Sequence, residues 1–271
     1  MDADAIILDL EARLPEMAKQ VISRGQISHG KERFLDNPDS VEEHEPRFHE
    51  YGIITHSRKF REAYENQVAG YLEDWGLGES VDTYLSESVD GVTKRDLLRI
   101  AMPLHDIGKF AKRITKDGRN YFREHAELGG EIVAKDLRMD LIEKYGLTDN
   151  QVDYVARCVR DHFALGKLRN LAKEQGRGFN LAYVNNGQFI KDVQKMRSQC
   201  EGFEVEAGLL FLADVLSKVG MDIDAETEEE IESQMPSVLE YIKGTSLDPI
   251  SIAQNPVNKR AARRFLEIAL H

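Results

Sequence analysis

Four histidines and two aspartates of this chain have the residue types that a metal centre requires. The sequence contains eight histidines, and four of them lie beside acidic or small residues at positions typical of helices or helix ends. The candidates are His56 in ITHSRKF, His105 and Asp106 in PLHDIGK, His125 in REHAELGGEI, His162 in VRDHFALGK and Asp214 in LFLADVLSK. Any one of these histidines alone is more often an ordinary core or surface residue than a ligand, so only the combination indicates a site.

The adjacent pair His105-Asp106 is the strongest single indication. It follows an apolar segment and Pro103, so an imidazole and a carboxylate can both face one pocket. A carboxylate has two oxygens and can bridge two metal ions. Imidazole and carboxylate ligands together suit Fe, Mn, Zn, Co or Ni. Two carboxylates cannot saturate two ions, so positions remain for water and substrate.

Asp214 carries an independent signal, because its flanking residues are strongly apolar. Burying an unpaired carboxylate is energetically costly. The residue therefore requires a partner, which the sequence leaves open between a metal ion, an arginine or lysine, and several hydrogen-bond donors.

The distribution of charge separates the candidate segments from the rest of the chain. The net charge of −12 argues against broad binding to nucleic acid or to an acidic membrane surface. By contrast, residues 109–123 hold six basic side chains against one acidic one, and residues 157–177 hold six against two. These charges are either solvated loop residues or the positive mouth of a pocket that attracts an anion. The individual candidates for binding a phosphate are Lys109, Arg58 and Lys167.

Helices must position these residues, because apolar side chains recur at helical spacing through most of the chain. The predicted helices span residues 4–24, 53–75, 125–145, 149–162, 188–198, 203–220 and 257–270. Thr93 and Asp96 form a plausible capping box for the segment DLLRIAMPL, which is apolar on most faces and is expected to be buried. Loops are predicted over residues 25–50, 107–124 and 164–187, and residues 79–92 are either an insertion or a short helix.

The fold class predicted from this pattern is all-α, because no alternating strand pattern of useful length, repeat or low-complexity tract is present. A chain of 271 residues is long enough for a well-buried core. We expect a single domain over residues 1–271, with a core at about 49–220 and helical extensions over 1–48 and 221–271.

The composition is that of an ordinary globular protein, with 41% hydrophobic and 31% charged residues. No apolar run has the length needed to cross a bilayer, and the acidic start of the chain does not resemble a secretory signal. Only two cysteines are present and they form no CxxC pair, so a reducing, cytoplasmic location is expected.

The order of the candidate motifs resembles the HD superfamily of metal-dependent phosphohydrolases. The segment His105-Asp106-Ile107-Gly108-Lys109 is similar to the HDIGK signature of its bacterial branch. The segment HAELGG that starts at His125 resembles the motif that follows, a histidine before small residues on a helix. The resemblance covers roughly residues 49–220 and implies an HD-domain helical bundle.

This resemblance implies a site for two divalent transition metal ions. The first ion would be held by His56, His105, Asp106 and Asp214. The second ion would be held by Asp106, His125 and His162, with Asp106 as the bridge. The nucleophile would be a hydroxide between the ions, which makes Asp106 and Lys109 the catalytic candidates, with Lys109 facing the substrate phosphate. Simpler HD nucleotidases lack the two middle histidines and use one ion.

Two branches of the superfamily match incompletely. HD-GYP phosphodiesterases have paired histidines where this chain has Asp161-His162, and the GYP part is absent. The layout is also similar to the HD domain of CCA-adding enzymes, including His49-Glu-Tyr-Gly52 before His56, but no nucleotidyltransferase domain accompanies it. His49 is either an additional site residue or a loop histidine.

The leading hypothesis is metal-dependent hydrolysis of a phosphomonoester or phosphodiester in a small, anionic, nucleotide-like substrate. Neither a membrane nor an extended nucleic acid is an expected partner. The first alternative is a diiron oxygenase similar to myo-inositol oxygenase, which uses the same four histidines and two aspartates. The second alternative is a non-catalytic nucleotide-sensing module. Lys109 and the basic segments favour a phosphate.

Overall fold

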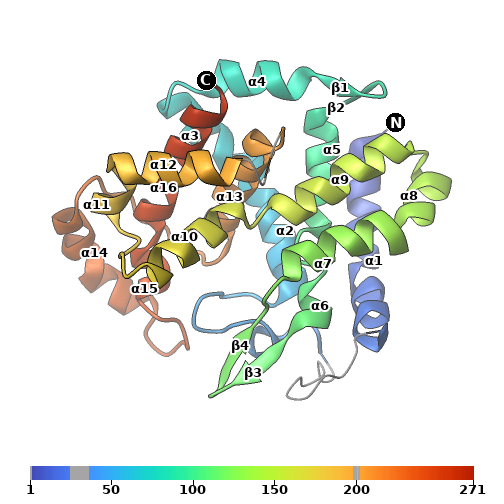
Figure 1. Ribbon diagram of the computed structural model, residues 1–271. Helices are drawn as coiled ribbons and strands as arrows, with labels where there is room; N and C mark the ends of the chain where they lie inside the picture. The colour runs from blue at the N-terminus through green and yellow to red at the C-terminus, as the bar shows by residue number, and fades with distance from the viewer. Residues whose placement is uncertain (1, 25–36, 198–199, 201) are drawn as a thin grey trace.

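The computed structural model describes residues 2–24, 37–197, 200 and 202–271, and this part of the chain is almost entirely helical (Figure 1). The predicted all-α class is confirmed. Of the predicted loop over residues 25–50, residues 25–36 lie outside the described residues. Residues 37–52 are irregular except for a 3₁₀ turn at Val41–Glu43.

The first half of the chain contains four of the six candidate ligands, with His56 and His125 on helices and His105 and Asp106 in a turn. The helices of this half are α1 (Ala3–Arg24), α2 (Ile53–Ala63), α3 (Ala69–Asp74), α4 (Gly78–Ser86), α5 (Lys94–Ala101), α6 (Lys109–Lys112), α7 (His125–Glu131) and α8 (Arg138–Tyr145). A π-helical turn over Tyr64–Val68 joins α2 to α3, and another over Ile132–Asp136 follows α7. The predicted helices 53–75 and 125–145 are therefore present as nearly continuous helical stretches.

The second half adds helices that surround one buried helix. They are α9 (Asp149–Asp161), α10 (Ala164–Glu174), α11 (Leu181–Val184), α12 (Gly187–Arg197), α13 (Glu204–Ser217), α14 (Glu228–Tyr241), α15 (Ile250–Ala253) and α16 (Asn255–Ala269). Nearly every residue of α13 is buried, and this helix packs against α2, α9, α10 and α16. A helix that is apolar on all sides is stable only in such a position.

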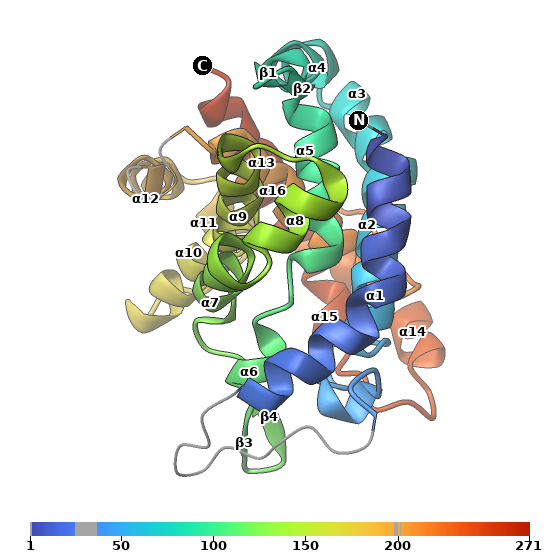
Figure 2. The same ribbon diagram turned by 90° about the vertical axis from the view of Figure 1, so that its right-hand side faces the viewer.

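In Figure 1, α1, α5 and α7 to α9 lie on one side of α13, and α3, α11 and α14 to α16 lie on the other. Figure 2 shows α1 lying alongside α2 and α5, which it contacts. α7 packs against α9, and α5 also contacts α9. Within the described residues, no helix combines the length and the apolar character needed to cross a bilayer.

The predicted loop over residues 107–124 is partly wrong, because this segment contains α6 and a β-hairpin. Strands β3 (Ile114–Lys116) and β4 (Arg119–Tyr121) pair antiparallel, with Lys116 opposite Arg119. The two connecting residues, Asp117 and Gly118, have φ of 53° and 70°. An Asp-Gly pair with positive φ at both positions is the preferred two-residue hairpin turn. A second hairpin, β1 (Ser88–Val89) and β2 (Val92–Thr93), follows α4.

One further segment is more helical than the sequence pattern predicts, and the expected helical extension over residues 221–271 contains α14. The predicted irregular segment 164–187 contains α10, whose residues Leu165, Leu168 and Ala172 are buried at helical spacing, so the prediction gave too much weight to its glycines. The acidic run that begins at Asp224 leads into α14, which Thr227 caps. Glutamates in a first turn interact favourably with the helix dipole, so a run of acidic residues is compatible with a helix start.

Candidate metal centre

The turn that carries His105 and Asp106 lies very close to α7 because of a glycine. These two residues follow the 3₁₀ turn Met102–Leu104 and precede α6. A Cβ atom on Gly108 would lie 2.0 Å from the carbonyl oxygen of His125. Only a residue without a side chain allows this approach. The glycine of the HDIGK segment therefore brings the pair next to the first residue of α7.

A second close contact brings α7 to α9. A Cβ atom on Gly130 would lie 2.9 Å from the carbonyl oxygen of Ala156 and 2.8 Å from Cβ of Arg160. His125 begins α7, and His162 directly follows α9. The small residues after His125 therefore bring these two histidines together, although they are 37 positions apart in the chain.

Three of the four histidines are oriented in the same way. In each ring Nδ1 lies within hydrogen-bonding distance of the backbone oxygen three residues earlier: 2.8 Å for His105 to Met102, 2.7 Å for His125 to Phe122 and 2.6 Å for His162 to Val159. A carbonyl oxygen can only accept, so Nδ1 donates, and in the neutral form of each ring Nε2 carries the free lone pair. This is how metal-binding histidines are commonly oriented.

The free Nε2 atoms of His125 and His162 face each other and one oxygen of Asp106. The two nitrogens are 3.3 Å apart, and Oδ1 of Asp106 lies 3.4 Å from the first and 3.7 Å from the second. Burial lowers the pKa of His125 to about 4 and that of His162 to about 3, so both rings are neutral near pH 7. Three buried acceptors therefore converge with no proton between them, an arrangement that a cation would stabilise.

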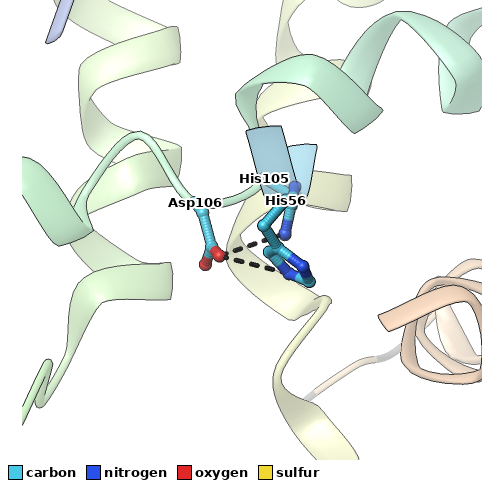
Figure 3. A group of neighbouring side chains, drawn as sticks. All are labelled: His56, His105 and Asp106. Carbon is cyan, nitrogen blue, oxygen red and sulfur yellow. Dashed lines mark ion pairs between the residues drawn. The ribbon is translucent and has the colours of Figure 1, made fainter. Parts of the chain in front are cut away.

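The other oxygen of Asp106 faces a second pair of histidines (Figure 3). Oδ2 lies 3.2 Å from Nε2 of His105 and 3.7 Å from Nε2 of His56, which comes from α2. Nε2 of His105 is buried and has no hydrogen-bond partner among the described residues. The ring of His105 stacks on Phe60 with centroids 4.0 Å apart, which holds its plane.

These contacts form two groups of potential ligands that share one residue. His56, His105 and Asp106 form one group, and Asp106, His125 and His162 form the other. All five side chains are buried. The pKa of Asp106 lies well below its usual range: burial acts to raise it, but the neighbouring His105 and Lys109 outweigh that effect. The donor set therefore suits divalent metal ions, and the Asp106 carboxylate is shared by both groups.

Asp214 lies beside the first group but also has a basic partner. Its Oδ1 is 3.2 Å from Nε2 of His56, and its Oδ2 is 2.6 Å from Nζ of Lys218. Burial acts to raise its pKa, but Lys218 and His56 hold it well below the usual range. Of the partners that the sequence left open, the structure thus includes a lysine. A role for Asp214 as a further metal ligand remains a prediction.

Lys109 is the one phosphate candidate that lies inside the cluster. Its Nζ is 2.7 Å from Oδ2 of Asp106, and the side chain is buried. Lys167 lies on α10, half exposed, and pairs with Glu127 of α7, two residues after His125. Arg58 is exposed on α2, while His56 of the same helix is buried. Two residues correspond to about 200° of helix rotation, so the structure does not bring Arg58 to the cluster.

The structure places further residues beside the cluster. His49, which the sequence left open between an additional site residue and a loop histidine, is buried beside His56, and so is His44, with ring centroids 4.9 and 5.5 Å from that of His56. Lys218 pairs with Asp214 as described, and burial lowers the pKa of Arg169, with Asp214 as its nearby opposing charge. The four-residue spacing of Asp214 and Lys218 on a helix was a readable signal. His44 lies in an irregular segment with no such pattern.

The comparisons with known proteins were made against family models, curated proteins and solved structures. A family model described as "HD domain" matches residues 67–218. This span includes every predicted metal ligand except His56, which precedes it. No curated protein and no solved structure matches the chain.

Proposed function

The chain belongs to the HD-domain family, and from this premise we propose that it is a metal-dependent phosphohydrolase. Its substrate would be a small phosphomonoester or phosphodiester of nucleotide-like character. The observation that carries the proposal is the arrangement of Asp106, whose two oxygens each face a separate pair of histidines. When bound there, two divalent cations would lower the pKa of a bound water and neutralise charge on phosphate oxygens.

The residues of the chain would hold these cations rigidly. Three imidazoles are already fixed in the tautomer that presents Nε2, so binding requires no proton rearrangement at those rings. Because the ligands are buried, water has access to few positions around them, which strengthens electrostatic interactions inside the site.

The basic side chains around the cluster support the proposal that the substrate is anionic. Lys109 pairs with Asp106, Lys218 pairs with Asp214, and Arg169 has Asp214 as its nearby opposing charge. If the two carboxylates coordinate metal ions, these basic groups lose much of their counter-charge. A phosphate group would restore the balance, and a small neutral substrate would not.

Neither cysteine is suited to replace metal chemistry as a nucleophile. Burial raises the pKa of Cys158 well above its usual value and that of Cys200 to about 11. The thiolate is the nucleophilic form, so both thiols are inert near neutral pH. This supports a mechanism in which water is the attacking group.

The test is a screen of protein reconstituted with Mn²⁺ against phosphomonoesters and phosphodiesters of nucleotides, with phosphate release and diester opening as readouts. We expect cleavage of at least one class, and we expect the Asp106→Asn variant to be inactive. Inert protein that is fully loaded with metal and still binds inorganic phosphate would contradict hydrolysis. Iron-dependent oxygen uptake with a small-molecule substrate would instead support the oxygenase hypothesis.

A further inference from the structure

We propose that His44 is a positioning residue that holds the Lys109 ammonium group in place for the substrate phosphate. This inference rests on the proposed function, because it concerns the same site. His44 lies outside the residues that the family model matches, so the family match does not assign it a role. It lies 65 positions before Lys109 in the chain, and folding brings the two side chains into contact.

The geometry determines which atom of His44 faces the lysine. Nδ1 of His44 lies 2.9 Å from the backbone oxygen of Tyr51, and Nε2 lies 2.8 Å from Nζ of Lys109. The carbonyl oxygen can only accept, so Nδ1 carries the proton. Nε2 therefore presents a lone pair, and the ammonium group donates to it. The imidazole acts as a neutral acceptor, which suits its complete burial.

Nζ of Lys109 thus has one hydrogen-bond acceptor, Nε2 of His44, and one ion-pair partner, the carboxylate of Asp106, which belongs to the candidate metal ligands. That carboxylate would be engaged with cations in the loaded site. A lysine side chain has a flexible stem of four carbons and loses considerable rotamer freedom when it is fixed. His44 is the acceptor that remains available to fix it. With one proton donated to His44, the ammonium group keeps other protons that can face a phosphate oxygen.

The backbone around His44 is itself tied to the segment that follows Lys109. Asn120, next to the turn of the β3–β4 hairpin, donates from Nδ2 to the backbone oxygens of Glu42 and His44, at 2.6 and 2.7 Å. Arg113 pairs with Glu43. On its other side, the His44 ring stacks on His49 with centroids 3.7 Å apart. These contacts give the imidazole a defined place relative to α6.

The experiment measures binding of inorganic phosphate to metal-loaded protein by calorimetry, together with metal content by elemental analysis. The variants are Lys109→Met, His44→Phe, His44→Gln and the double variant His44→Phe/Lys109→Met. Phenylalanine keeps an aromatic ring that can stack but removes both the acceptor for Lys109 and the donor to Tyr51, whereas glutamine keeps one acceptor and one donor group. Lys112→Met is the matched control, because Lys112 lies on the same helix but pairs with the exposed Glu124 and not with Asp106 or His44.

We expect Lys109→Met to weaken phosphate binding about ten- to a hundredfold, the range for losing a charge-assisted hydrogen bond. His44→Phe should weaken it by a similar factor, and the double variant should be no weaker than Lys109→Met alone. His44→Gln should bind better than His44→Phe, and Lys112→Met should match the wild type. Metal content should be unchanged throughout.

Three outcomes would overturn the inference. One is a double variant whose loss is the product of the two single losses, since His44 would then act independently of Lys109. Another is loss of metal in His44→Phe, which would show a purely structural role. The third is wild-type protein that binds metal but no phosphate. If phosphate binds with the expected pattern and no ester is cleaved, the hydrolase proposal fails while the role of His44 stands.

Discussion

Asp106 is the residue on which both groups of potential ligands depend, because its two oxygens face different pairs of histidines. Asp161 differs from Asp106 in the partners of its carboxylate. It is also buried and is adjacent to His162, but it pairs with Arg157 and Arg160 rather than with the cluster. The two buried aspartates therefore have different partners, and substitutions at each should separate their roles.

Replacing Asp106 with asparagine should abolish binding of both metal ions, because the amide carries no charge and cannot bridge them as a carboxylate does. Metal content after incubation with Mn²⁺ and gel filtration is the measurement. Asp161→Asn is the matched control and should retain the full metal content. Retention of one ion per chain in Asp106→Asn would show that the two groups do not share this residue as a bridge.

The metal-free protein should become less stable as the pH falls below 6.5. Burial lowers the pKa of His125 to about 4 and that of His162 to about 3, from an ordinary value of 6.5. Below pH 6.5 the unfolded chain binds protons that the folded rings do not, so stability is lost as the pH falls toward the folded-state pKa values. Each such histidine contributes about 1.4 kcal/mol per pH unit within this window.

Urea denaturation of the chelator-treated protein between pH 7 and pH 5 measures this effect. Carboxylates such as Asp106, whose pKa lies well below 3.8, contribute little to the change in the free energy of unfolding between pH 7 and pH 5. The double variant His125→Gln/His162→Gln should show a shallower loss of the free energy of unfolding with falling pH than the wild type. Equal slopes would mean that these rings do not titrate as their burial implies.

At the scale of secondary-structure elements, glycines determine how closely the ligand-bearing segments approach one another. Gly108 allows the turn after the 3₁₀ segment to touch the start of α7, and Gly130 allows α7 to pack closely on α9. In both places the nearest atoms include backbone atoms, which cannot move aside as a flexible side chain can. The short spacing of small residues in the sequence therefore has a packing role.

Gly108→Ala should destabilise the protein by at least about 1–3 kcal/mol, the usual cost of overpacking, because the added methyl group would meet the His125 carbonyl oxygen. It should also weaken metal binding, since it separates Asp106 from His125. Chemical denaturation and metal titration are the measurements. Gly70→Ala is the control: this position in α3 has open space around it, and the change should stabilise the helix by about 0.5–1 kcal/mol. Equal effects of the two substitutions would contradict the packing argument.

For the whole molecule, the candidate ligands come from segments far apart in sequence. They lie on α2, in the turn before α6, at the start of α7, after α9 and on α13. The segment around residues 37–52 connects this region to the C-terminal half, since Arg47 pairs with Asp248 and the backbone nitrogen of Glu50 donates to the backbone oxygen of Lys218. Metal ions bound by these residues would therefore connect helices from both halves of the chain.

Binding of Mn²⁺ should raise the free energy of unfolding, because unfolding disperses ligands drawn from distant segments. At a free metal concentration one hundred times the Kd, one site contributes about 2.7 kcal/mol. Thermal or urea denaturation with increasing Mn²⁺ is the measurement. Asp106→Asn should show no such dependence, and an equal shift in that variant would place the stabilising ions elsewhere.

Local sequence patterns alone were sufficient to predict the all-α class, to name the candidate ligands in chain order and to indicate the resemblance to the HD superfamily. Helical periodicity and an adjacent His-Asp pair are readable without knowing the packing, and the family match agrees with them. The same patterns underestimated α10 and missed the β3–β4 hairpin, because glycines and charges are compatible with helices and turns alike.

Only the tertiary structure decided which atoms meet. It pairs Asp214 with Lys218, leaves Arg58 exposed on α2 and brings His44 against Lys109. The physical reason is that such contacts depend on the packing of segments separated by tens of residues, and glycine contacts between backbones set that packing. A histidine in an irregular segment has no periodicity to predict its direction, so its place in the site becomes visible only in the folded chain.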